Sequence, residues 1–494
     1  MRFRLKRIQI SSGGPMIAVM NISDAAENNL HRGDRIELIK GAKKAIAIVD
    51  TTKDALLVPE GWLGLNHELS SKLGQSGTAD AGLIDKSHSL AYIKKKLDGK
   101  ELSEKEFLSI ISDIARNALS EIEITYFVSA CYTHGLSNEE TAFLTKAMIN
   151  TGDLLKISKK FVLDKHCIGG VAGNRTTMLA VPIVAAAGYT VPKTSSRSIT
   201  SPAGTADTME VLCKVDLPLG KVKKVIAKTG ACIVWGGALS LAPADDIIIR
   251  VEHPLGIDAY GQLVASVLGK KKSVSSTHVL IDIPYGQGAK VKTKARAEKL
   301  GSIFRYVGEK IGLKIFLMYS KGSKPVGKGI GPALEARDVL YVLRNDPRQP
   351  LDLRKKSLEM AGKMIEMTGK KNGFAIARKI LDSGLAYEKM VEIINAQGKR
   401  HIEPGTIPLG RLSYEVKAHR SGAIQAIRND IAVSIARAAG APKDAEAGIY
   451  LKRLEGERIL KGQALFTVYS NSEARLAHAK SICKKLSKEF YIIK

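Results

Sequence analysis

The sequence predicts an α/β protein: a helical subdomain plus an α/β domain with a mostly parallel sheet, together with an extra N-terminal β-rich domain and a C-terminal α+β domain. Two observations carry this prediction. Capping signals before apolar helical runs mark residues 85–158 as helical. From about residue 160, short apolar strands alternate with helical segments. The expected domains are 1–84, 85–158, 159–335 and 336–494.

The β-rich prediction for the first segment depends on short runs of β-forming residues between Gly, Asp and Asn turns. These runs are MIAVMN (16–21), RIELIK (35–40) and KAIAIVD (44–50). The stretch GQSGTADAG (74–82) is rich in small and turn-forming residues, so we interpret it as the exit linker.

The helical segment contains three capping boxes, in which a serine and a glutamate three residues later satisfy unpaired N–H groups at a helix start. The pairs are Ser103/Glu106, Ser120/Glu123 and Ser137/Glu140. Apolar residues at helical spacing follow, which predicts a helical subdomain up to about residue 155.

Strands of the α/β domain are expected at FVLD (161–164), CIVW (232–235), HVLIDI (278–283) and KIFLMY (314–319). Helical stretches separate them, and this alternation predicts parallel pairing. Helical patterns fill much of 333–398, and alternation in 448–470 predicts short strands of the terminal α+β domain.

The net charge of +27 is high for a chain with 45% apolar residues. It fits nucleic-acid binding, the attraction of small polyanionic substrates, or a lysine-rich solvated surface. Aromatic residues make up only 5% of the chain and do not interleave with basic runs, which argues against a base-stacking surface and disfavours nucleic acid as the partner.

The five cysteines form no CxxC pair and no Cys/His spacing typical of a metal site, so we expect a reducing compartment and no metal. The basic N-terminus lacks the apolar region of a signal peptide. The longest apolar stretch, 178–188, is too short to cross a bilayer. We therefore expect a cytoplasmic protein with no membrane partner.

The stretch VLDKHCIGGVAGN (162–174) places Lys165, His166 and several glycines between a strand and a helix expected to begin near Asn174. Glycines let backbone N–H groups approach an anion, and the helix start adds partial positive charge. The alternatives are an anion site or a tight structural turn.

The stretch 193–210 surrounds Arg197 with hydroxyl side chains, those of Ser195, Ser196, Ser198, Thr200, Ser201 and Thr205. Such clusters are usually solvated loops or helix caps, and Asp207 and Glu210 fall where they suit a cap. An arginine among hydroxyl donors also binds phosphate, and the two loops together favour phosphate.

In the stretch 247–272, Ser266 and Lys270 lie four residues apart and would share one face of a helix. A buried Asp258 would have a raised pKa and could donate a proton, whereas this segment by itself favours a helix-capping aspartate. Lys290 follows a Gly-x-Gly turn directly after a strand.

Four motifs in the same order resemble the thymidine/pyrimidine-nucleoside phosphorylase family, most closely its AMP phosphorylase branch. They are DKHCIGGV (164–171), SSRSITSPAGTADTME (195–210), LAPAD (241–245) and ASVLGKK (265–271). The resemblance covers about residues 85–480, and the β-rich domain at 1–84 is similar to the additional domain of that branch.

The resemblance implies a helical subdomain that closes onto an α/β domain, and a reaction in which inorganic phosphate displaces a base from C1′ in nucleotide salvage or degradation. It implies no cofactor, phosphate as co-substrate, and a homodimer or higher homo-oligomer. Phosphate ligands implied by the motifs are Lys165, Thr176, Ser195 and Thr205. Base-side residues are His166, Arg250, Ser266 and Lys270, and the general acid is Asp258. Nucleotide contacts are Gly170, Ser196, Arg197, Ser198, Ile199, Thr200, Ser201, Thr205, Ser266 and Lys290.

Departures from the nucleoside-specific members bear on the substrate. Where they usually have two glycines and a histidine, the loop 196–201 has hydroxyls, which can bind the 5′-phosphate that a nucleoside lacks. Cys167 stands where they usually have a serine. We therefore expect AMP as the substrate, with CMP and UMP as further candidates, and keep a pyrimidine-nucleoside phosphorylase and a nucleic-acid-binding protein as alternatives.

Overall fold

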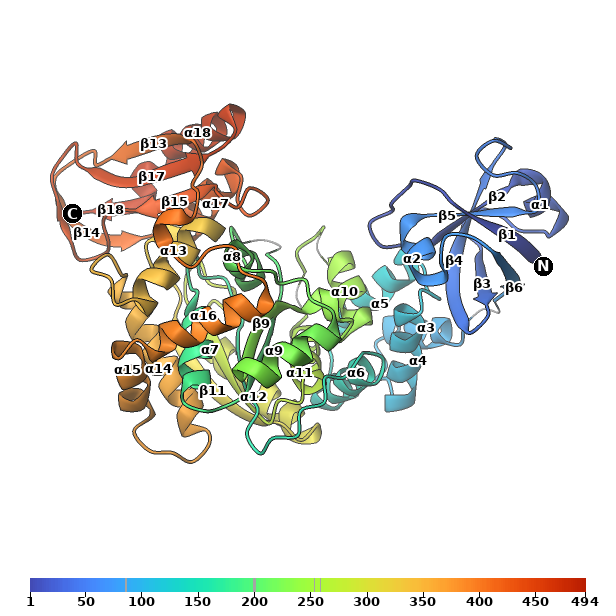
Figure 1. Cartoon of the computed structure of the whole chain (residues 1–494), viewed down its shortest axis with the longest axis horizontal. Helices are drawn as coiled ribbons and strands as arrows, with labels where there is room; N and C mark the ends of the chain where they lie inside the picture. Colours follow the sequence, from blue (N-terminus) through green and yellow to red (C-terminus); the bar gives the residue numbers. More distant parts are fainter. Residues whose placement is uncertain (85–86, 199–200, 253, 258) are drawn as a thin grey trace. The chain divides into compact units, whose positions relative to one another are not determined.

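The computed structural model describes residues 1–84, 87–198, 201–252, 254–257 and 259–494. The chain divides into two compact units. One consists of Met1–Thr151 with Pro243–Gln262, and the other of Gly152–Ala242 with Leu263–Lys494 (Figure 1). The predicted division into four domains stays a prediction.

A closed six-stranded barrel forms the start of the first unit, with strand order β1-β5-β2-β4-β3-β6 (Figure 1). Its strands are β1 (Arg2–Arg7), β2 (Ile17–Asn21), β3 (Arg35–Lys40), β4 (Lys43–Thr52), β5 (Trp62–Leu65) and β6 (Thr78–Leu83). The short helices α1 (Ile22–Glu27) and α2 (His67–Leu73) accompany them. The three β-forming runs of the sequence are thus strands β2, β3 and β4.

The predicted exit linker is wrong for most of its length, because β6 occupies Thr78–Leu83 and closes the barrel by pairing with β1 and β3. Ala79 and Ala81 alternate with polar residues and are buried. Small side chains fill the narrow interior of a small barrel, and the same residues suggest a loop when they are considered as sequence alone.

Helices make up the rest of the first unit: α3 (Ser89–Leu97), α4 (Glu104–Ala115), α5 (Glu121–His134), α6 (Asn138–Asn150) and α10 (Pro243–Glu252). The three predicted capping boxes are confirmed at the starts of α4, α5 and α6. Helix α10 comes from a later part of the chain and packs against α4 and α5.

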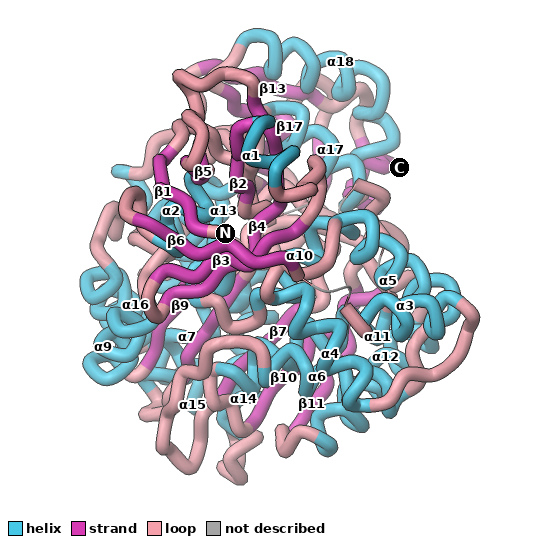
Figure 2. Tube along the Cα trace, turned by 90° about the vertical axis from the view of Figure 1, so that its right-hand side faces the viewer, coloured by secondary structure: helices cyan, strands magenta, loops and turns pink. Residues whose placement is uncertain are grey.

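Parallel strands form the centre of the second unit. Strands β7 (Leu163–Cys167), β10 (His278–Tyr285) and β11 (Lys314–Lys321) lie side by side in the order β11-β10-β7 (Figure 2). Strands β8 (Val191–Ser195) and β9 (Ala231–Trp235) form a second parallel pair, and a bridge between Val162 and Thr190 joins it to β7. The four predicted strands are present and parallel; β8 was not predicted because its VPKTS sequence is polar and contains proline.

Helices cover these strands: α7 (Thr176–Ala186), α8 (Thr205–Leu212), α9 (Leu219–Thr229), α11 (Tyr260–Ser273), α12 (Lys294–Lys310), α13 (Pro332–Leu343), α14 (Leu351–Glu366), α15 (Gly373–Asp382) and α16 (Leu385–Gln397). Helix α7 is apolar and buried along almost its whole length. It packs against α14 and α16, which makes it the centre of the main core.

The C-terminal part combines two small sheets with two helices. One sheet has the order β12-β15-β17-β13 and the other the order β16-β14-β18. The elements are β12 (Gly329–Ile330), β13 (Leu412–Lys417), β14 (Gly422–Ile427), α17 (Asn429–Ala439), β15 (Gly448–Leu451), β16 (Arg458–Ile459), β17 (Ala464–Ser470), α18 (Glu473–Phe490) and β18 (Tyr491–Ile493). Within the described ranges, no helix is both long enough and apolar enough to cross a membrane.

The helical part of the first unit contains a buried ion pair that should determine its stability. Lys96 Nζ lies 2.7 Å from Glu140 Oε1, and both side chains are almost completely buried. Replacing Lys96 by alanine leaves a buried carboxylate without its cation, so we expect the free energy of unfolding to fall by ~3–5 kcal/mol. Urea unfolding followed by circular dichroism measures this.

The matched control is Lys146→Ala, which removes the partner of Glu104 from an exposed pair with a 2.9 Å separation. Exposed pairs contribute little because water screens them, so this change should cost less than ~1 kcal/mol. Equal losses in both variants would contradict the importance of the buried pair.

Candidate active site

The glycine-rich turn after β7 has the backbone that the sequence suggested. Gly169, Gly170 and Gly173 have φ values of +94°, +84° and +70°, which side-chain-bearing residues rarely adopt. A Cβ atom on Gly170 would lie 2.5 Å from the backbone nitrogen of Lys290. The turn therefore packs directly against the loop after β10, and two residues predicted to contact the nucleotide are neighbours.

Lys165 and Thr176, both predicted phosphate ligands, are hydrogen bonded to each other. Lys165 Nζ donates to Thr176 Oγ1 at 2.9 Å and to Thr177 Oγ1 at 3.0 Å, at the start of α7. Burial lowers the pKa of Lys165, although Asp282 offsets part of this effect. A bound anion would favour the charged ammonium, so the environment is suited to phosphate.

Arg175, which the sequence analysis did not single out, connects this turn to the start of α8. Its Nη1 donates to Thr205 Oγ1 at 3.1 Å and its Nη2 to the carbonyl of Ala203 at 3.1 Å. Its Nε lies 2.5 Å from Glu335 Oε2, and both side chains are buried. Thr205 is thus held by a cation that comes from the turn after β7. The contact between Arg175 and Thr205 could not be predicted from the sequence, because the two residues lie 30 positions apart.

The hydroxyl-rich loop is organised partly by its own groups. Asp207 Oδ2 accepts hydrogen bonds from the backbone N–H groups of Ser198 and Gly204, both at 2.8 Å. Ser198 Oγ lies 2.9 Å from Ser201 Oγ and donates to the Ser201 carbonyl. The cap interpretation is therefore confirmed for Asp207. Ile199 and Thr200 lie outside the described residues.

Arg197 forms ion pairs with carboxylates of helix α8. Its guanidinium binds Glu210 through both terminal nitrogens, lies 3.4 Å from Asp207 Oδ1, and stacks 5.0 Å from the ring centre of Trp235. The hydrogen bonds from Arg197 lower the pKa of Glu210. Glu210 is thus the partner of Arg197, and the nucleotide contact expected of Arg197 stays a prediction.

Three buried charged residues that were not assigned from the sequence are Asp164 on β7, the strand that also carries His166, Lys193 on β8 and Lys271 on α11. Lys271 Nζ is 2.9 Å from Asp164 Oδ2, and both Lys271 and Lys193 donate to the carbonyl of Thr194. Burial, followed by the charge of Lys271, lowers the pKa of Lys193 well below its usual value. Burial and these lysines also lower the pKa of His166 well below 6.5, so His166 is a neutral imidazole.

The remaining predicted residues lie on several elements. Ser266 and Lys270 are both on α11, four residues apart as predicted, and Ser195 ends β8. Arg250 lies on α10 in the first unit, where its Nη2 is 3.3 Å from Glu121 Oε1. Asp258 lies outside the described residues, so its role as general acid stays a prediction.

Cys167, which replaces the usual serine, is a half-buried thiol. Burial raises its pKa to about 11, and Asn174 Nδ2 donates to its sulfur at 3.4 Å. A thiol is a weak hydrogen-bond donor, so the side chain of Cys167 is a poorer partner for an anion than a serine hydroxyl.

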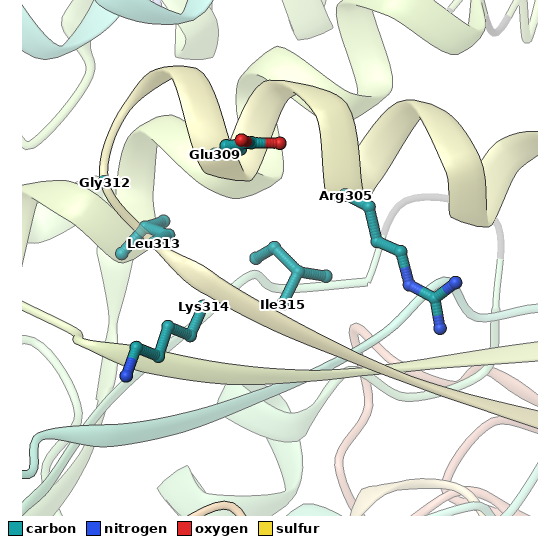
Figure 3. Close-up of a pocket in the computed structure, with 6 residues that line it drawn as sticks. All are labelled: Arg305, Glu309, Gly312, Leu313, Lys314 and Ile315. Carbon is teal, nitrogen blue, oxygen red and sulfur yellow. The ribbon is translucent and has the colours of Figure 1, made fainter.

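A surface pocket lies elsewhere, at the turn from α12 into the amino end of β11 (Figure 3). Its lining consists of Arg305, Glu309, Gly312, Leu313, Lys314 and Ile315. Open parallel sheets bind ligands at the carboxyl ends of their strands, where the turns after β7, β8 and β10 lie. We therefore locate the candidate site at these turns and not at this pocket.

Comparison with known proteins identifies the family. AMP phosphorylase 1 from Archaeoglobus fulgidus is 43% identical over 483 residues, which cover 97% of this chain and 95% of that protein. The chain belongs to the AMP phosphorylase branch of the thymidine/pyrimidine-nucleoside phosphorylase family. A protein named putative thymidine phosphorylase from Albidiferax ferrireducens is also 43% identical, over 91% of this chain and 87% of that protein.

Family descriptions match three parts of the chain. They are "Glycosyl transferase family, helical bundle domain" at 90–152, "Glycosyl transferase family, a/b domain" at 159–275 and "Pyrimidine nucleoside phosphorylase C-terminal domain" at 423–489. Anthranilate phosphoribosyltransferase from Thermus thermophilus shares the fold, with a TM-score of 0.54 and 20% identity over 62% of this chain and 98% of that chain. The helical bundle and α/β parts of the predicted fold class are confirmed.

The neutral state of His166 predicts a pH dependence of stability. Because the pKa of His166 is lowered in the folded protein, the unfolded chain takes up a proton below pH ~6.5 that the folded chain does not. The free energy of unfolding therefore decreases as the pH is lowered through this range. His166→Gln cannot be protonated. We expect the loss in free energy of unfolding between pH ~7.5 and ~5.5 to be ~1 kcal/mol smaller in this variant, as measured by urea unfolding.

His419→Gln is the control, since His419 is exposed on the C-terminal part of the same unit. This change should leave the pH dependence as it is in the unaltered protein. An unchanged pH dependence in His166→Gln as well would contradict a neutral, half-buried imidazole at this position.

Proposed function

We propose that this pentosyltransferase phosphorolyses AMP, with CMP and UMP as further candidate substrates. The bond between C1′ and the base nitrogen breaks, a phosphate oxygen bonds to C1′, and the base leaves with a proton as ribose 1,5-bisphosphate forms. The observation that carries the proposal is the nearly full-length similarity to a protein named AMP phosphorylase 1.

The attacking phosphate would bind to the hydroxyls of Thr176 and Thr205. Each of these oxygens already accepts a hydrogen bond from a buried cation, Lys165 or Arg175. Each hydroxyl proton is therefore available for donation to a phosphate oxygen, and the cation behind it strengthens that bond. Ser195 at the end of β8 would supply a further hydroxyl.

The loop 196–201 would bind the 5′-phosphate of the nucleotide, and Gly170, Ser266 and Lys290 would contribute further contacts. Asp207 accepts hydrogen bonds from the backbone N–H groups of Ser198 in the loop and of Gly204 after it, and Gly170 packs against Lys290. Backbone groups that are held before binding lose less conformational entropy when the ligand arrives. This contact to the 5′-phosphate is what would separate nucleotides from nucleosides.

Positive charge develops on the ribose as the base leaves, and the bound phosphate would offset it electrostatically. We assign the proton donation to the base to Asp258. His166 is neutral and lies among lysines, so it suits hydrogen bonding to the base rather than charge stabilisation. Arg250 and Lys270 are the other base-side candidates.

We also propose a cytoplasmic homodimer or larger homo-oligomer that needs no cofactor beyond its co-substrate phosphate. The absence of CxxC pairs supports a reducing compartment. The positive net charge of +27 would draw nucleotides and phosphate, both anions, toward the protein.

The first test is phosphate-dependent release of free base from AMP, adenosine and uridine. We expect release from AMP and turnover of the two nucleosides that is at least ~100-fold slower, because they lack the 5′-phosphate for loop 196–201. Chromatography of the products, with CMP and UMP in parallel, measures this.

Omitting phosphate is the control, since hydrolysis would continue without it and phosphorolysis would stop. Preferred turnover of uridine would support the pyrimidine-nucleoside phosphorylase suggested by the name of the second relative. Salt-dependent retention on a random oligonucleotide, without turnover of any substrate, would support nucleic-acid binding instead.

A second test concerns Asp258. Asp258→Asn cannot give a proton to the leaving base, so we expect kcat to fall ~10²–10⁴-fold while AMP still binds with nearly unchanged affinity. Steady-state kinetics and isothermal calorimetry measure the two effects. Unchanged turnover would remove Asp258 from the mechanism.

A further inference from the structure

We propose that Asn429 is a positioning residue for nucleotide binding, which holds together the turn with Gly170 and the loop with Lys290. Neither the motifs nor the resemblance pointed to this residue, which belongs to the C-terminal part. The inference rests on the proposed function, because it concerns the binding of the same nucleotide.

The carboxamide of Asn429 bonds to both loops at once. Its Oδ1 accepts from the backbone N–H of Ala172 at 2.9 Å, and its Nδ2 donates to the carbonyls of Gly170 at 2.5 Å and Gly288 at 3.0 Å. An amide can form four hydrogen bonds, and here three of them go to the two loops. The residue is 1% exposed, so water does not substitute for these partners.

The glycines make this approach possible. Gly170 and Gly288 have φ values of +84° and +86°, and a Cβ on Gly288 would lie 3.3 Å from Asn429 Cβ. A Cβ on Gly170 would collide with the backbone of Lys290. Side chains at these two positions would push the loops apart. Loss of the Asn429 amide, which donates to the carbonyls of Gly170 and Gly288, would also let the loops separate.

Helix α17 holds Asn429 in place from outside the site. Asn429 is the first residue of α17, whose Ile431, Ile435 and Ala436 are buried in the C-terminal core. Its hydrogen-bond partners lie far away in the sequence. Ala172 and Gly170, in the turn after β7, are 257 and 259 positions away, and Gly288, in the loop after β10, is 141 positions away. The C-terminal part thereby sets the spacing between Gly170 and Lys290.

Asn429 does not itself hold the attacking phosphate. Lys165 donates a hydrogen bond to Thr176 and Arg175 donates one to Thr205, and neither bond involves the carboxamide. Loss of Asn429 should therefore weaken nucleotide binding and leave phosphate binding intact. A purely structural role would lower stability without this selectivity.

The test is Asn429→Asp, which keeps the shape but replaces the donating NH₂ by an oxygen that repels the two carbonyls. We expect KM for AMP to rise ~10-fold or more, with KM for phosphate unchanged and kcat within ~3-fold. Asn429→Ala, which leaves room for a bridging water, should show a smaller increase of the same kind.

The matched control is Gln397→Glu. Gln397 is fully buried in the same unit, and its amide also accepts from one backbone N–H, that of Ile233, and donates to two carbonyls, those of Lys214 and Ile233. This change should lower the melting temperature and leave both KM values unchanged. Backbone hydrogen exchange in residues 168–174 and 284–292 should be faster in Asn429→Asp than in the unaltered protein, and unchanged in Gln397→Glu.

The outcomes are distinguishable. If the unaltered protein does not turn over AMP, the proposed function fails, and this inference fails with it. If the unaltered protein is active and Asn429→Asp keeps its KM for AMP, the inference alone is overturned. Equal increases in KM for AMP and for phosphate, or unchanged hydrogen exchange in both loops, would also overturn it.

Discussion

The candidate site depends on buried ammonium groups that outnumber the carboxylates beside them. Lys165, Lys193 and Lys271 are all buried behind the ends of β7 and β8, and Asp164 forms an ion pair with Lys271. Burial lowers the pKa of Lys165, and burial followed by the charge of Lys271 lowers that of Lys193. A dianionic ligand would supply negative charge here, so phosphate bound as we propose would favour the charged form of the lysines. The co-substrate in our proposal would thus offset an excess of buried positive charge.

In the proposed phosphate site, this charge would act on the ligand through hydroxyl groups. Thr176 and Thr205 each accept a hydrogen bond from a buried cation, Lys165 and Arg175, and can donate outward. Glu335 pairs with Arg175, which keeps that guanidinium in one orientation. A lysine in direct contact with phosphate would act as a point charge. A hydroxyl that accepts a hydrogen bond from a buried cation donates its own proton along one direction, which also orients the phosphate. Directional contacts suit a phosphate that must attack one carbon atom.

How much could be predicted from the sequence depended on the range of the interactions involved. The capping boxes and the strands β7, β9, β10 and β11 follow from local patterns and were predicted. Strand β6 was not, because its alanines look like a linker until barrel closure buries them. Arg175 and Asn429 were not, since their partners lie far away in the sequence and only folding brings them together. Motifs find residues that contact ligands more readily than the residues that position them.

The distinction between residues that contact a ligand and residues that position others also applies to the hydroxyls of the loop 196–201. Ser198 and Ser201 are bonded to each other and to a loop carbonyl, and Asp207 holds the backbone of Ser198. Arg197 is turned toward Glu210 and Trp235. The hydroxyl protons of Ser198 and Ser201 thus go to the carbonyls of Ser201 and Ala203, and the first of these bonds connects described residues on the two sides of positions 199 and 200. In the proposed complex, the residues that these bonds already hold would lose less conformational entropy when the 5′-phosphate binds, so more of the free energy of its contacts would remain for positioning the ribose.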